Sequence, residues 1–130
     1  MINNDDLKRK QALIEGKFGN LNLRELLKQD FEMDFPITGG QGNSIDNPIV
    51  FERTDSNYYY VGYEYSILKC LGIGRRITWK VISQELLKHN GKDIDKVKIE
   101  TTQTMPTQII TQIENYYFDV TQCVGRAFEK

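Results

Sequence analysis

Hydrophobic and polar residues alternate most clearly in the C-terminal half of the chain. Three segments there have the pattern of strands, at residues 78–88, 94–102 and 107–120. The third segment places Ile109, Thr111, Ile113 and Tyr117 on one face, with Ile110, Phe118 and Val120 near the other. Asn90-Gly91, between the first two segments, is typical of a two-residue hairpin turn. We therefore expect an antiparallel β-meander over about residues 78–120.

Two segments fit a helix as well as a strand. In residues 58–71 five tyrosines favour a strand, whereas an apolar stripe at helical spacing favours a helix. We interpret this segment as a helix that ends at Gly72, because Gly72 and Gly74 provide a stop signal. Residues 78–88 also suit a helix capped by Thr78, but the following hairpin signal favours a strand.

The N-terminal part of the chain predicts two short amphipathic helices. The first begins at Asn3 or Asn4 and ends by Gly16 or Gly19. The second opens at Asn22, with Glu25 three residues later in a capping-box arrangement. Its apolar stripe consists of Leu23, Leu26, Leu27 and Phe31. We expect these helices to cover one face of the sheet.

A segment rich in glycine and proline separates these helices from the rest. Residues 35–48 predict no regular element. Residues 49–53 then favour a short strand, and Pro48 at its start suggests an edge position. The chain is therefore expected to form a single α+β domain over residues 1–130, in which two or three helices cover one face of the meander. A cone-shaped version of this fold would enclose a pocket between sheet and helices.

Composition and charge limit the partners. The chain has 17 basic and 18 acidic residues and a formal net charge of -1, which argues against a nucleic-acid binder held by a strong general basic field and leaves a local basic patch as the alternative. A protein partner or a homodimer is expected ahead of nucleic acid. We expect no membrane segment, because no apolar run reaches about 18 residues. The polar, acidic N-terminus is unlike a signal peptide, and Cys70 and Cys123 are too few for a disulfide framework. A reduced, cytoplasmic setting is expected.

The glycine-rich loop is one candidate site for an anion. Successive backbone N–H groups in such a loop can form an anion-binding nest. The alternative is a tight connection at the sheet edge, since neither the P-loop nor the dinucleotide fingerprint is present. The residues that a ligand would contact here are Gly39, Gly40, Gly42, Ser44 and Asp46.

A second candidate for anion binding is the pair Arg75 and Arg76, close to Trp79. Guanidinium groups suit carboxylate or phosphate, and tryptophan suits stacking. A solvated turn with a buried tryptophan explains the same residues without a ligand.

The tyrosines suggest a surface for protein partners. Five tyrosines spread around one helix cannot all be buried, so some are expected to line a contact surface. The residues that we assign to such an interface are Tyr58, Tyr59, Tyr60, Tyr63 and Trp79.

No reaction follows from the remaining residues. His89 is the only histidine and has no partner visible in the sequence, and no spacing supports a metal site or requires a cofactor. The first hypothesis is a cytoplasmic, non-enzymatic interaction, accessory or immunity-type domain that acts through an aromatic surface and can self-associate. The alternative is a small enzyme or ligand binder that holds an anionic molecule with residues 39–42 and the two arginines.

Overall fold

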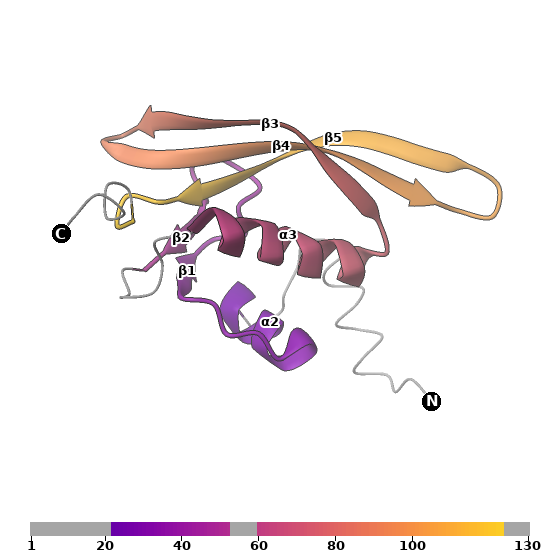
Figure 1. The fold of residues 1–130 in the computed structure, drawn as a ribbon, viewed down its shortest axis with the longest axis horizontal. Helices are drawn as coiled ribbons and strands as arrows, with labels where there is room; N and C mark the ends of the chain where they lie inside the picture. Colours follow the sequence, from indigo (N-terminus) through magenta and orange to yellow (C-terminus); the bar gives the residue numbers. More distant parts are fainter. Residues whose placement is uncertain (1–21, 53–59, 124–130) are drawn as a thin grey trace.

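A computed structural model describes residues 22–52 and 60–123 of the chain. The elements in chain order are α2 (Leu23–Phe31), β1 (Ile37–Gly39), β2 (Ile49–Phe51), α3 (Tyr60–Arg75), β3 (Thr78–His89), β4 (Lys92–Thr104) and β5 (Ile109–Asp119). Figure 1 shows the meander of β3, β4 and β5 as one layer, with α3 and α2 on the same side of it. The α+β class and the meander are confirmed, and the sheet is open. The expected first helix lies outside the described residues.

The meander follows the register that the hairpin signal predicts. His89 pairs with Lys92 across the turn, where Asn90 and Gly91 have positive φ of 51° and 76°. This is the backbone of a type I′ turn, which favours asparagine followed by glycine. Residues 78–88 are therefore a strand, and the helical alternative for them is wrong. A β-bulge at Ile82 shifts the pairing of β3 with β4 by one residue.

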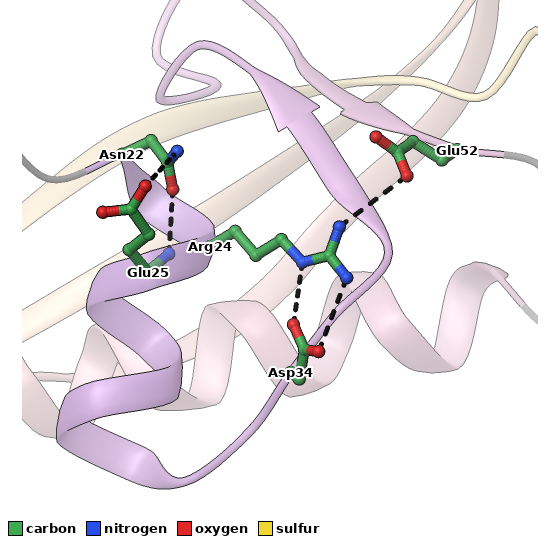
Figure 2. A network of polar contacts seen from close by, with 5 residues as sticks. All are labelled: Asn22, Arg24, Glu25, Asp34 and Glu52. Atoms are coloured by element: carbon green, nitrogen blue, oxygen red, sulfur yellow. Dashed lines mark hydrogen bonds and ion pairs between the residues drawn. The ribbon is translucent and has the colours of Figure 1, made fainter.

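The N-terminus of α2 is capped as expected. Asn22 Oδ1 accepts a hydrogen bond of 2.8 Å from the Glu25 backbone N–H, and Asn22 Nδ2 donates one of 2.9 Å to Glu25 Oε1 (Figure 2). Arg24 then ties the helix to two neighbouring segments. Its Nε donates to Asp34 Oδ1 at 2.7 Å, and its Nη1 lies 3.7 Å from Glu52 Oε2.

Two details of the first strands differ from the sequence prediction. β1 lies within residues 35–48, where no regular element was expected. The sheet order β1-β2-β5-β4-β3 also places β2 between β1 and β5, so the predicted edge position for residues 49–53 is wrong. Gly39, with φ of 83°, helps the chain reverse after β1 and pair it with β2 on the outside. β2 itself runs parallel to β5.

Helix α3 runs past the predicted stop at Gly72 and ends at Arg75. Arg76 has a left-handed φ of 59°, and the Ile77 N–H donates to the Gly72 carbonyl at 3.0 Å, which closes the helix end. Gly72 serves a different purpose from a stop signal. A Cβ at this position would lie 2.9 Å from Trp79 Cδ1, so the missing side chain lets the indole approach the helix.

One hydrophobic core joins the helices to the sheet. Its central members are fully buried side chains from α2, β2, α3, β4 and β5: Leu27, Ile49, Phe51, Ile67, Val97 and Phe118. The rings of Phe51 and Phe118 stack with their centroids 5.8 Å apart. No helix in the described part of the chain is long and apolar enough to cross a membrane.

Removal of the Asn22 cap should destabilise the protein. Asn22→Ala leaves the N–H of Glu25 without its side-chain acceptor, and the free energy of unfolding should fall by about 1 kcal/mol. Urea unfolding measures this loss. Asn22→Asp keeps an acceptor and is the matched control, so an equal loss in both variants would contradict the capping role.

Candidate functional site

The glycine-rich loop connects β1 to β2, and its backbone groups are used within the fold. The N–H groups of Gly40 and Gly42 donate to the carbonyls of Pro48 and Asn47 at 2.9 and 3.0 Å. The Gly42 carbonyl accepts from the Tyr117 N–H at 2.7 Å. These bonds describe a tight strand connection, and the N–H groups that they use are not directed at a ligand. The side chain of Ser44 is exposed beside this connection.

Asp46 has a partner that the sequence did not reveal. Its Oδ1 lies 3.0 Å from His89 Nε2, so the loop meets the β3–β4 turn. A hollow of about 80 Å³ lies beside this contact, lined in part by Asp46, His89 and Lys92. The side chain of Asp46 remains 80% exposed, so this contact lies largely in solvent.

The two arginines have different environments. Arg75 makes a two-pronged contact with Glu114, through hydrogen bonds of 2.6 and 2.8 Å, and also donates to the Tyr116 hydroxyl at 3.2 Å. Thr101 Oγ1 donates to the same carboxylate at 2.8 Å. The hydrogen bond with Glu114 raises the pKa of Arg75, and burial raises that of Tyr116. Arg76 is exposed at the left-handed position after the helix.

Burial and hydrogen bonding have opposite effects on the pKa of Glu114. Burial acts to raise its pKa, but the hydrogen bonds from Arg75 and Thr101 outweigh it and hold the pKa below the usual value. The arginine is therefore committed to an internal ion pair that joins the end of α3 to β5.

The described tyrosines of α3 pack against the core. Tyr63 contacts Phe35 and Phe51, with ring centroids 6.0 and 6.1 Å apart. Tyr65 lies beside Trp79, and Tyr60 is partly buried against the same core. Tyr58 and Tyr59 lie outside the described residues.

The sequence analysis missed a buried pair of acidic residues beneath α3. Glu64 is fully buried, and Asp95 on β4 is 4% exposed. Gln84 Nε2 donates to both, at 3.0 Å to Glu64 Oε1 and 2.6 Å to Asp95 Oδ2. Tyr65 orients Gln84 by donating to its Oε1 at 2.6 Å. A signal for this cluster existed, because Glu64 shares the helical stripe of Ile67, Leu68 and Leu71.

Glu64 is neutral in this environment. Burial and the adjacent Asp95 raise its pKa to about 10. As a carboxylate, its Oε2 would have no donor among the described residues. As a carboxylic acid, Glu64 has a hydroxyl that can donate to the Asp95 carboxylate, which accounts for the arrangement.

The most exposed feature is the end of the meander beyond α3. Sixteen residues of α3 span about 24 Å, whereas thirteen residues of β4 span about 44 Å. α3 contacts the sheet from Glu64, near Asp95, to Arg75, near Thr101 and Glu114. The strands continue past this point as a hairpin, and Figure 1 shows it extending beyond the end of α3. We call residues 102–113 the projecting hairpin.

The projecting hairpin is uncharged and consists of threonine and glutamine together with Met105, Pro106 and three isoleucines. No charged residue occurs from Thr101 to Ile113. Ile109 is 68% exposed, and Ile113 and Met105 are 50% and 41% exposed. The turn is closed by a hydrogen bond of 2.8 Å from the Met105 N–H to the Gln108 carbonyl. The exposed isoleucines of this hairpin are its candidate contact residues.

Comparison with family models, with curated proteins and with solved structures gives no match for this chain. Within residues 22–52 and 60–123, no three histidine, cysteine or acidic side chains are grouped to hold a metal ion. The geometry of the described residues is therefore the basis for a functional proposal.

The neutral form of Glu64 predicts a pH-dependent stability. Its folded pKa lies above the unfolded value of about 4.3, so between these values the folded state holds a proton that the unfolded state releases. The free energy of unfolding should consequently fall as pH rises, by at most about 1.4 kcal/mol per pH unit from this group. Glu64→Gln should remove this slope and be the more stable variant above neutral pH.

Urea unfolding of both proteins between pH 5 and 9 tests this expectation. Glu32→Gln, at an exposed position, controls for loss of a negative charge. If the wild-type and Glu64→Gln curves run parallel over this range, Glu64 is ionised in the folded protein.

Proposed function

We propose that this protein is a non-enzymatic interaction domain that binds another protein through the projecting hairpin. The observation that carries the proposal is the exposure of Ile109 and Ile113 on the face of β5 that points away from both described helices. Exposed branched apolar side chains lose unfavourable hydration when a partner covers them.

This proposal moves the contact surface away from the aromatic residues of α3. Tyr60, Tyr63 and Trp79 already pack against the core, so most of their apolar surface is committed within the domain. The exposed isoleucines of the hairpin can be covered without disturbing that packing. Its lack of charge also means that no ionised group must be desolvated on binding.

The alternative of an anion-binding pocket has less support. It requires loop N–H groups and arginine side chains that face a ligand. In the described residues Gly40 and Gly42 donate to backbone carbonyls, and Arg75 donates to Glu114. An anion would have to displace these bonds, which offsets its own binding energy.

We further propose a reducing, cytoplasmic setting. Cys70 and Cys123 are both buried thiols that form no disulfide, which suits a protein kept in a reducing compartment.

Site-specific photo-crosslinking tests the binding role of the hairpin. A photo-reactive amino acid at Ile109 should capture a partner in cells that make the protein, and mass spectrometry identifies it. With that partner purified, Ile109→Thr and Ile113→Thr should each weaken the Kd at least about tenfold, since truncation of a central apolar contact costs more than 1 kcal/mol.

Ile73 provides the matched control, because it is 60% exposed but lies on α3. A crosslinker at Ile73 should capture little of the same partner, and Ile73→Thr should leave the Kd unchanged. Equal capture at both positions, or equal affinity of all three variants, would refute the proposal.

A further inference from the structure

Strand β3 has a sheet neighbour on one side only in the described part of the chain. It is the last strand in the order β1-β2-β5-β4-β3, and it is twelve residues long. Its other edge therefore presents backbone N–H and C=O groups that can pair with another strand. Val81, Ile82 and Leu86 along it are 39%, 46% and 52% exposed. This edge combines unused hydrogen-bonding groups with uncovered apolar surface.

The bulge at Ile82 gives β3 an internal symmetry that its sequence does not show directly. Val81 pairs with Ile99, Ser83 with Lys98 and Gln84 with Val97. The three partners are consecutive on β4, so Ser83 is the central residue of β3 when its residues are counted by their β4 partners. Counted in the same way, Lys80 and Glu85 lie two positions from Ser83 on opposite sides, because their partners Glu100 and Lys96 are each two residues from Lys98. Trp79 and Leu86 lie three positions from Ser83, because their partners Thr101 and Asp95 are each three residues from Lys98. Without the bulge these pairs would not be equidistant from one central residue.

We propose that a second copy of this chain pairs antiparallel with β3 about a two-fold axis at Ser83. Each contact then occurs twice, as an isologous interface requires. The facing pairs are Ser83 with Ser83, Val81 with Gln84, Lys80 with Glu85, and Trp79 with Leu86. In every pair both side chains lie on the same face of the joined sheet.

Charge selects this register among the alternatives. An axis at Ser83 sets Lys80 of each copy opposite Glu85 of the other, which gives two ion pairs. An axis at Glu85 would instead set two carboxylates against each other, and one at Lys80 would oppose two ammonium groups. Like charges facing across a strand pair are destabilising, so the register at Ser83 is favoured.

The same register covers apolar surface. Leu86 is the most exposed apolar residue of β3, and it meets the partly buried Trp79 of the second copy. Aromatic and aliphatic side chains that face each other across strands stabilise a sheet. The bulge increases local twist, so the joined sheet should twist strongly at its centre. The proposed pairing of β3 with β3 of a second copy does not involve the projecting hairpin and is independent of the function proposed above.

Charge reversal on the full-length chain tests the proposed β3–β3 dimer interface. Sedimentation velocity should show a dimer for the wild type. Glu85→Lys or Lys80→Glu alone sets like charges in contact and should weaken dimerisation at least about tenfold. The double variant Lys80→Glu/Glu85→Lys restores opposite charges and should restore the dimer. Lys69→Glu, on the exposed side of α3, should have no effect.

Cysteine crosslinking gives a second readout that does not depend on affinity. Ser83→Cys places two thiols next to each other at the axis, within the separation that a disulfide spans. Mild oxidation should link this variant into a covalent dimer much faster than Glu32→Cys, a control at an exposed position after α2. A monomeric wild type, or a double variant that stays as monomeric as the single ones, would overturn the proposal. So would equal crosslinking of the two cysteine variants.

Discussion

The difference in length between α3 and the strands beneath it shapes this molecule. A helix rises 1.5 Å per residue and a strand about 3.4 Å, so a 16-residue helix covers only about half of a 13-residue strand. Where α3 lies, the inner face of β4 is closed to water. Val97 and Ile99 on that face are buried, whereas Gln103 and Ile110, farther along the same face, are partly exposed. Ile109 and Ile113 lie on the opposite face of the sheet, away from both described helices, and are exposed. One sheet thus has a half that holds the core and a half that remains available.

The polar residues mark the limits of the covered half. Arg75 and Glu114 form their ion pair where α3 ends, and Thr101 adds a hydrogen bond to the same carboxylate. Glu64 lies nearer the other end of the helix and is bridged to Asp95 by Gln84. A buried group of this kind lowers stability unless it is fully hydrogen-bonded, but it restricts how the helix can be placed on the sheet. Together the two clusters fix the position of α3 along the strands.

The sequence predicted the elements whose signals are local. The turn at Asn90-Gly91 and the cap formed by Asn22 and Glu25 each depend on residues within one turn, and both were predicted correctly. The end of α3 was not, because Gly72 serves a contact with Trp79 on another element. β1 escaped prediction because three residues form a strand only when β2 lies beside them.

The candidate sites were harder to predict for the same reason. Arg75 and the glycine loop suggested an anion site, but their hydrogen bonds are to Glu114 on β5 and, within the loop, to residues near Pro48. The buried cluster of Glu64, Gln84 and Asp95 joins three elements, so its members cannot be assembled from spacing alone. The exposure of Ile109 and Ile113 follows from the position of both described helices on the other face of the sheet, a relation between elements that no local pattern contains.

Residue-resolved amide hydrogen exchange tests the claim that α3 divides the meander into two halves. Under native conditions, amide protons of Val97 and Ile99 should exchange only through global unfolding. Those of the projecting hairpin, such as Gln103 and Ile110, should exchange through local opening at a much lower free energy. If the hairpin amides are as strongly protected as those of Val97 and Ile99, the meander is stabilised along its whole length and α3 does not divide it.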